Sequence, residues 1–160
     1  MQGDKRVLSM SSENQQHLSW ESVHRDAISL AQQIKDKGPW KKIVAVTRGG
    51  LIPTAIIVQY LDIRLVDTVC LATYTRANQQ TEAEIFKSHY DDSDRILVVD
   101  DIVDTGKTYE ILHKFLPNAT FVALYCKPAG EGWLDYAVNK IDQDVWLVFP
   151  WEEGAPTDQS

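Results

Sequence analysis

Short runs of consecutive apolar residues alternate along the chain with longer segments of helical spacing. The apolar runs lie at 42–47, 69–74, 96–99, 119–126 and 144–149, and β-branched residues are frequent in them. Apolar residues recur every three or four positions in 23–34 and 109–116, whereas 51–61 is apolar on every side. Uninterrupted apolar strands are typical of parallel sheets that are covered on both faces. The pattern therefore predicts an α/β fold with an open, mostly parallel twisted sheet and flanking helices.

The two ends of the chain lack this periodicity. Residues 1–18 are mostly polar, and we expect a mostly disordered leader there. Ser19 is a good N-cap for the first helix, so we place a single domain at 19–153 and a loose tail at 154–160. Residues 75–94 form a long polar segment, which predicts a loop that acts as a lid beside a site.

Composition narrows the class of protein. The chain has 160 residues, which suits one domain, and its formal net charge of −7 argues against binding nucleic acid through counterion release. No apolar run reaches the roughly 20 residues of a membrane span, so we expect a cytoplasmic protein. Cys70 and Cys126 lie in apolar runs without metal-ligand spacing, which predicts buried, reduced thiols.

The most informative stretch follows the apolar run at 96–99. Asp100 and Asp101 are expected to end the buried strand, and 105–108 reads Thr-Gly-Lys-Thr before a helix. The free N–H groups of a helix start, together with a glycine and hydroxyls, form a good phosphate site. Carboxylates beside such a site, here with Asp104 as a third, fit magnesium, sugar hydroxyls or a base that accepts a proton. A nucleotide-triphosphatase loop is excluded because position 101 lacks the required glycine.

A second turn with possible chemistry follows the strand at 42–47. Arg48-Gly49-Gly50 exposes consecutive backbone N–H groups beside a guanidinium, which is typical of an anion-binding nest. These three residues alone slightly favour a plain tight turn between a strand and a helix. The helix that follows, at 51–61, is expected to be buried or to pack on another subunit because it is apolar all round.

Several of these stretches resemble one enzyme family. Val98–Thr108 is similar to the phosphoribosyl diphosphate (PRPP) signature of type I phosphoribosyltransferases. Further stretches resemble, in order and spacing, the bacterial xanthine-guanine branch of that family: 45–53, 66–70, 126–130 and 143–146 with 150–151. The resemblance covers Trp20 to Glu152. It implies the type I phosphoribosyltransferase fold with a small purine-binding hood region.

The resemblance also implies roles for individual residues. The PRPP-binding residues would be Arg48, Gly49, Asp100, Asp101, Asp104, Thr105, Gly106, Lys107 and Thr108. Mg²⁺ is the implied cofactor, held by Asp101 and Asp100 with Asp101 as the closer contact, and Asp104 would be the catalytic group that takes a proton from the purine. The purine-binding residues would be Asp104, Lys127, Trp146 and Leu147. Without the motifs around them, Trp146 would be assigned to the core and Lys127 to the solvated surface.

We therefore predict a purine salvage enzyme that makes GMP and XMP, and IMP more weakly, from PRPP and guanine, xanthine or hypoxanthine. The family further implies a homotetramer or homodimer and leaves a peripheral membrane association open. Two residues depart from the xanthine-guanine branch: Gln80 replaces a loop arginine, and Lys107 replaces a glycine and is typical of hypoxanthine-guanine enzymes. Two alternatives stay open, a non-catalytic PRPP-binding regulatory protein and a phosphoribosyltransferase with hypoxanthine-guanine or another base preference.

Overall fold

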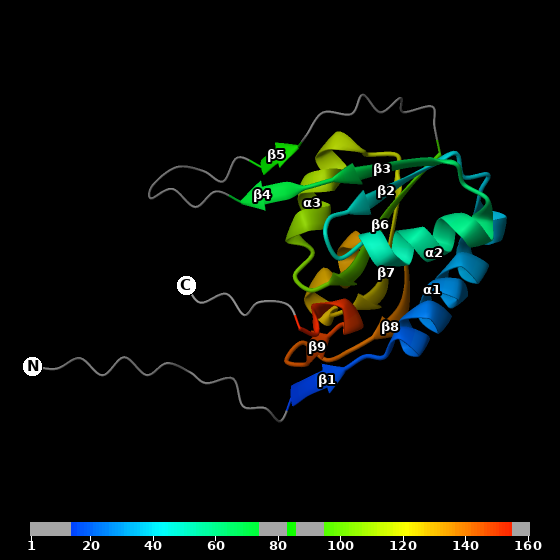
Figure 1. Cartoon of the computed structure of the whole chain (residues 1–160). Helices are drawn as coiled ribbons and strands as arrows, with labels where there is room; N and C mark the ends of the chain where they lie inside the picture. The colour runs from blue at the N-terminus through cyan, green and yellow to red at the C-terminus, as the bar shows by residue number, and fades with distance from the viewer. Residues whose placement is uncertain (1–13, 74–82, 86–94, 155–160) are drawn as a thin grey trace, which may run out of the picture.

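A five-stranded parallel sheet forms the centre of the protein. The computed structural model describes residues 14–73, 83–85 and 95–154 (Figure 1). The strands lie in the order β3-β2-β6-β7-β8, and every neighbouring pair is parallel. Their bounds are β2 Lys42–Val46, β3 Leu65–Val69, β6 Ile96–Val103, β7 Thr120–Cys126 and β8 Tyr136–Lys140. The predicted open parallel sheet is confirmed.

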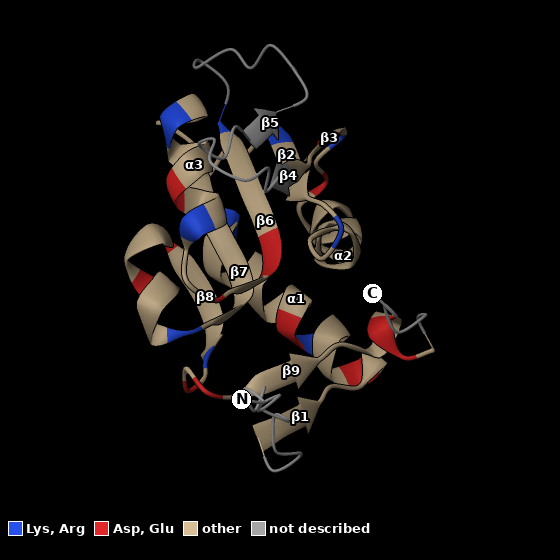
Figure 2. Ribbon diagram, turned by 90° about the vertical axis from the view of Figure 1, so that its left-hand side faces the viewer, with Lys and Arg blue, Asp and Glu red and all other residues tan. Residues whose placement is uncertain are grey.

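Helices cover both faces of this sheet. The bounds are α1 Trp20–Ile34, α2 Leu51–Leu61 and α3 Lys107–Phe115. Figure 2 shows α2 and α3 on opposite sides of the sheet, with the acidic end of β6 between them. Alternate residues of one strand face the two sides: Leu97 packs in the core under α1 and α2, and Val98 packs in the core under α3. This double burial explains why the strands read as unbroken apolar runs.

A small second unit is built from the first and last strands of the described chain. β1 (Gln15–His17) pairs in parallel with β9 (Trp146–Val148), and the short 3₁₀ helix η4 (Pro150–Glu152) follows (Figure 1). This unit is the small region that the resemblance implied as a hood. The predicted leader is wrong at its end, because 15–17 form a strand and Leu18 is buried. Residues 1–13 lie outside the described residues.

Three further elements complete the described chain. They are the 3₁₀ helices η2 (Lys35–Lys37) and η3 (Pro128–Trp133), and a two-stranded antiparallel sheet of β4 (Leu71–Thr73) and β5 (Ala83–Ile85). The apolar run at 69–74 was predicted as one strand of the main sheet. That prediction is wrong, since β3 ends at Val69 and β4 belongs to the separate pair. Cys70 between them is exposed, whereas Cys126 is buried as expected.

β6 continues beyond the acids that were expected to end it. The strand runs to Val103, which pairs with Cys126 on β7, and Asp101 is itself buried. The prediction that burial stops at Asp100 is therefore wrong. The continued pairing matters because it brings both carboxylates to the carboxyl edge of the sheet on a rigid element.

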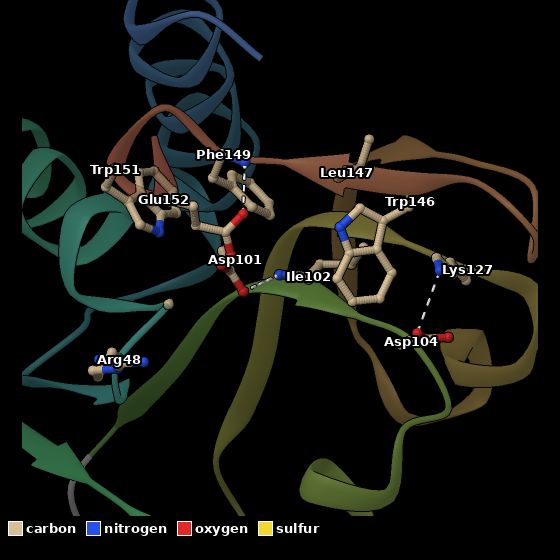
Figure 3. A pocket seen from close by; sticks show the side chains of 11 residues that line it. Arg48, Asp101, Ile102, Asp104, Lys127, Trp146, Leu147, Phe149, Trp151 and Glu152 are labelled. Atoms are coloured by element: carbon tan, nitrogen blue, oxygen red, sulfur yellow. Dashed lines mark hydrogen bonds and ion pairs between the residues drawn. The ribbon is translucent and has the colours of Figure 1, made fainter. Parts of the chain in front are cut away.

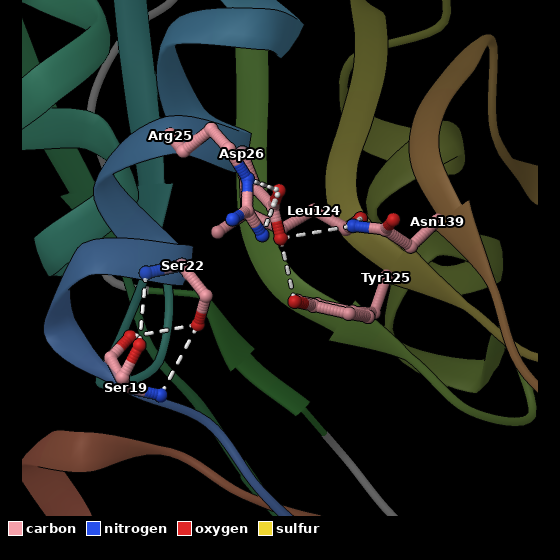
Figure 4. A network of polar contacts seen from close by, with 7 residues as sticks. All are labelled: Ser19, Ser22, Arg25, Asp26, Leu124, Tyr125 and Asn139. Carbon is pink, nitrogen blue, oxygen red and sulfur yellow. Dashed lines mark hydrogen bonds and ion pairs between the residues drawn. The ribbon is translucent and has the colours of Figure 1, made fainter.

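A buried polar network fastens α1 to the sheet. The helix begins at the predicted N-cap, where the Ser19 side chain accepts a hydrogen bond from Ser22 N–H. Further along α1, the buried carboxylate of Asp26 accepts hydrogen bonds from Tyr125 Oη at 2.6 Å and Asn139 Nδ2 at 3.0 Å (Figure 4). These contacts join α1 to β7 and β8. Among the described residues, no helix is long and apolar enough to cross a membrane.

Candidate functional site

The site lies at the carboxyl ends of β6 and β7. In open parallel sheets this edge is where ligands bind. The chain leaves β6 at Val103, passes through Asp104 and Thr105, and enters α3 after Gly106. Gly106 has φ +80°, and a Cβ atom there would overlap the Trp133 ring of η3. Both the backbone conformation and the close packing therefore require glycine at this turn.

Two cavities open at this edge. The larger, of about 550 Å³, is lined by Arg48, Gly49, Asp101, Ile102, Asp104, Lys127, Trp146, Leu147, Phe149, Trp151 and Glu152 (Figure 3). The smaller, of about 150 Å³, is lined by Asp100, Ile102, Val103, Asp104, Thr105, Gly106, Lys107, Thr108 and Tyr109. Ile102 and Asp104 line both cavities. One ligand could therefore place one part in each cavity, with Asp104 at the point where the two parts join.

The loop after β2 packs directly on β6. A Cβ atom at Gly49 would overlap the carboxylate of Asp101, and one at Gly50 would overlap the backbone oxygen of Val99. The Arg48 side chain borders the larger cavity beside this contact (Figure 3). The two glycines thus allow the predicted anion-binding turn to lie against the acidic end of β6, which a plain tight turn would not need.

The two acids of β6 lie in an unfavourable electrostatic setting. Burial away from water, and then the negative charge of Asp101, raise the pKa of Asp100 well above its ordinary value. Burial also raises the pKa of Asp101, and the nearby Glu152 carboxylate adds to this, although the Ile102 N–H and Asp100 hydrogen bonds oppose it. A divalent cation at these oxygens would relieve the repulsion between the carboxylates.

Asp104 is held by two side chains from other segments. Lys127, which directly follows β7 and is buried, places its Nζ atom 3.3 Å from Asp104 Oδ2 (Figure 3). Gln143 donates through Nε2 to Asp104 Oδ1 at 2.7 Å. The buried ammonium has a partner, as a buried charge requires. The site therefore holds an acceptor and a cationic donor side by side.

Aromatic side chains form one wall of the larger cavity. Trp146, at the start of β9, is 50% exposed. Phe149 and Trp151 stack on each other, with ring centroids 4.6 Å apart and an interplanar angle of 15°. Glu152 accepts a hydrogen bond from Phe149 N–H at 3.0 Å, which holds this turn (Figure 3). An exposed indole beside a carboxylate and an ammonium suits a flat, polar heterocycle.

Comparison with known proteins identifies the family. The phosphoribosyl transferase domain family matches residues 16–157 of the chain. The chain belongs to the phosphoribosyltransferase family. It is 42% identical over 135 residues to a xanthine-guanine phosphoribosyltransferase of Desulfotalea psychrophila. The aligned residues cover 84% of this chain and 84% of that protein. The family predicted from the sequence, and the enzyme class with it, are confirmed.

Solved structures agree with this assignment. A purine phosphoribosyltransferase from Pyrococcus horikoshii has a TM-score of 0.77 and 30% identity, covering 91% of this chain and 99% of that one. A xanthine-guanine-hypoxanthine phosphoribosyltransferase from Helicobacter pylori has a TM-score of 0.68 and 26% identity, covering 87% and 94%. The predicted fold is thus shared with solved phosphoribosyltransferases over nearly the whole chain.

All the residues that the sequence predicted for the phosphoribosyltransferase site line one of the two cavities. Arg48, Gly49 and Asp101 line the larger cavity with the predicted purine-binding residues, and the other PRPP-binding residues line the smaller. Ile102, Phe149 and Gln143 were missed. Phe149 was read as the end of an apolar strand, and Gln143 reaches Asp104 across 39 positions of sequence. Gln80 lies outside the described residues, so its replacement of a loop arginine stays a prediction.

Proposed function

We propose that the protein transfers the 5-phosphoribosyl group of PRPP to guanine or xanthine, and more weakly to hypoxanthine. The products are GMP, XMP or IMP, together with diphosphate. The observation that carries this proposal is the pairing of buried Lys127 with Asp104 in a cavity that Trp146 borders. A donor, an acceptor and an exposed indole at one place match the requirements of a 6-oxopurine. The names of the relatives support the same substrate class.

The two cavities divide the substrates between them. The smaller cavity offers the first N–H groups of α3 and the hydroxyls of Thr105 and Thr108, which suit the 5′-phosphate of PRPP. Arg48 and Gly49, which line the larger cavity together with Asp101, suit the diphosphate. The ribose would then lie along Asp100 and Asp101. In this pose the anomeric carbon points toward the part of the larger cavity that holds the purine.

The reaction exchanges one bond at the anomeric carbon. An imidazole nitrogen of the purine forms the new bond to carbon, while the bond from carbon to the diphosphate oxygen breaks. The proton of the attacking nitrogen passes to Asp104, whose carboxylate borders both cavities. Lys127 donates to the 6-oxo group, so it favours guanine, xanthine and hypoxanthine over adenine. The Leu147 carbonyl and the backbone near Glu152 are the contacts we assign to position 2 of the base.

Mg²⁺ is the cofactor we assign to the acidic end of β6. Asp100 and Asp101 present hard oxygen donors, and burial raises the pKa of each carboxyl group, so a cation would favour their charged forms. The described residues contain no group of three or more His, Cys, Asp or Glu side chains that could hold a metal alone. The ion would therefore share its coordination with substrate oxygens. When bound, it neutralises charge on the diphosphate as that group leaves.

We further propose that the protein acts as a homodimer or homotetramer in the cytoplasm. The support for assembly is an apolar surface on α2 and the edge strand β3, where Leu51, Tyr60, Leu65 and Val66 are between 41% and 56% exposed. Large exposed apolar side chains of this kind are frequent at protein interfaces. Sedimentation velocity would give the assembly state. A peripheral membrane association stays a prediction from the resemblance.

The direct test is nucleotide formation from PRPP, Mg²⁺ and one base at a time. We expect turnover of guanine and xanthine, weaker turnover of hypoxanthine, and little or none of adenine, measured by chromatography of the products. Asp104→Asn should lower kcat by about 10²-fold or more, because the acceptor for the purine proton is lost. Asp62→Asn, at an exposed position after α2, is the matched control and should retain wild-type rates.

Two other outcomes would point elsewhere. Binding of PRPP without turnover of any base would contradict the enzyme and favour a regulatory protein that senses PRPP. Efficient turnover of hypoxanthine in place of xanthine would instead support the hypoxanthine-guanine preference, which Lys107 suggests.

A further inference from the structure

Both ends of the Gln143 amide are occupied, and they fix its orientation. Ala129 N–H donates to Gln143 Oε1 at 3.0 Å, and Gln143 Nε2 donates to Asp104 Oδ1 at 2.7 Å. A backbone N–H can only donate and an ionised carboxylate can only accept, so the two partners require the same placement of the amide oxygen and nitrogen. Gln143 is therefore a fixed donor to Asp104.

Gln143 also joins three segments that meet at the site. Ala129 lies in η3, Asp104 follows β6, and Gln143 lies in the turn between β8 and β9, which a hydrogen bond from Val145 N–H to the Asp142 oxygen closes at 3.2 Å. Asn14 holds the same turn by donating to Asp144 at 2.7 Å. Since β9 begins with Trp146, the Gln143 amide connects Asp104 to the turn that positions the aromatic wall of the larger cavity.

The other contact of Asp104 cannot replace this one. Lys127 contacts Oδ2 at 3.3 Å, and in the proposed function the same ammonium donates to the 6-oxo group of the purine. A lysine side chain moves its charge on a flexible stem, whereas a planar amide fixed at both ends does not. Gln143 binds Oδ1, so Oδ2 is the oxygen left for Lys127 and for the purine proton.

We propose that Gln143 is a positioning residue for Asp104. It orients the carboxylate so that Oδ2 meets the imidazole N–H of a base that lies against Trp146. This inference rests on the proposed function, because the role has meaning only if Asp104 accepts a proton from the purine. Gln143 itself needs no contact with either substrate.

The variant Gln143→Glu separates the two hydrogen bonds of the amide. A glutamate has the same shape and still accepts from Ala129 N–H, but at alkaline pH it places a negative oxygen against Asp104 Oδ1. When the pH falls, one proton held between the two acids restores a donor to that oxygen. Other charged groups near the pair are Lys127 on Oδ2, Asp142 and Asp144 beside Gln143 in the chain, and Glu131 of η3, which pairs with Lys140 of β8.

The expected result is a pH-dependent loss of activity. The kcat/KM of Gln143→Glu for guanine should fall by about tenfold or more at pH 8.5 and by less than about threefold at pH 6, relative to wild type. Gln143→Met, which loses both hydrogen bonds, should be impaired at both pH values. The KM for PRPP should change by less than about threefold, because the phosphate contacts lie elsewhere.

Three comparisons decide the proposal. Gln32→Glu, the same change on the exposed surface of α1, is the matched control and should behave as wild type. In an Asp104→Asn background, Gln143→Glu should change the residual rate by less than about twofold, because Gln143 acts through Asp104. Wild-type rates for Gln143→Glu at both pH values would overturn the positioning role alone. Absence of turnover by the wild type would overturn the proposed function and this inference together.

Discussion

The Nζ atom of Lys127 lies 3.3 Å from Oδ2 of Asp104, so the two groups proposed to contact the purine also contact each other. Lys127 is buried at the end of β7, while about half of the Asp104 side chain is exposed. The carboxylate is therefore the hydrogen-bond partner that this buried polar group requires. A base that enters the larger cavity therefore meets a donor and an acceptor side by side.

The first prediction concerns this lysine. Lys127→Met keeps most of the apolar stem but removes the donor to the 6-oxo group. A hydrogen bond to a charged group contributes about 1.5–3 kcal/mol, so we expect kcat/KM for guanine to fall by about 10- to 100-fold. Lys140→Met, at an exposed lysine paired with Glu131 away from the larger cavity, is the control. Unchanged guanine kinetics in Lys127→Met would contradict the assigned base contact.

A second prediction concerns the contact of Gly49 with Asp101. Gly49→Ala would place its methyl group into the Asp101 carboxylate, so that either the loop or the carboxylate must move. We expect KM for PRPP to rise by about tenfold or more, because both the proposed diphosphate loop and the proposed magnesium ligand would be displaced. Steady-state kinetics with varied PRPP measure this.

The matched control for Gly49 is another glycine of the described chain. A Cβ atom at Gly132 would meet no atom within 4 Å, so Gly132→Ala should leave the kinetics unchanged. If Gly49→Ala also retained the wild-type KM for PRPP, the loop would not be the diphosphate site. A loss of folding in the variant, seen as a lower Tm, would be separated from this by the thermal unfolding curve.

Local sequence signals predicted the sheet and the turn into α3 well, because both depend on neighbouring residues. Buried strands give apolar runs, and a Thr-Gly-Lys-Thr turn carries its own backbone chemistry. β8 was missed because its residues are half-buried and mixed in polarity, and its Asn139 donates to Asp26, which lies 113 positions earlier. The end of β6 was misplaced because acids usually end buried strands, whereas here pairing with β7 continues past them.

The site shows the same limit. Asp104 and Lys127 could be found from motifs, but the support of Asp104 by Gln143 depends on the turn before β9 folding back onto the end of β6. The exposed Cys70 likewise follows from tertiary structure, since the chain leaves the main sheet one residue before it. Contacts across dozens of positions leave no periodic signal in the sequence.

A third prediction concerns the polar network under α1. Tyr125→Phe removes the hydroxyl that donates to Asp26 at 2.6 Å and leaves that buried carboxylate with one donor fewer. The free energy of unfolding should fall by about 1.5–3 kcal/mol, which corresponds to a Tm lower by about 4–10 °C. Tyr60→Phe, at an exposed position on α2, is the control and should shift Tm little. Equal Tm values for the two variants would show that the network contributes no net stability.

The last prediction concerns the charge at the end of β6. Because burial raises the pKa of Asp100, the folded chain binds this proton more tightly than the unfolded chain does. Protonated Asp100 therefore contributes its full stabilisation at about pH 4 and below. This stabilisation is lost as the pH rises through the raised pKa of Asp100. Asp100→Asn stays neutral at every pH and keeps an oxygen that can accept from Asp101 N–H. Without divalent metal, its Tm should equal the wild-type value near pH 4 and exceed it at pH 8.

The size of this Tm difference between Asp100→Asn and the wild type can be measured directly. One pKa unit corresponds to about 1.4 kcal/mol, which would raise the Tm of Asp100→Asn by several degrees at pH 8. Its activity should fall, because the variant loses a proposed magnesium ligand. Asp62→Asn, at an exposed carboxylate, should show no such trend with pH. A constant difference between wild type and Asp100→Asn across this range would mean that the Asp100 carboxylate is not destabilising in the folded protein. The acids of β6 would then have no stored repulsion for a magnesium ion to relieve.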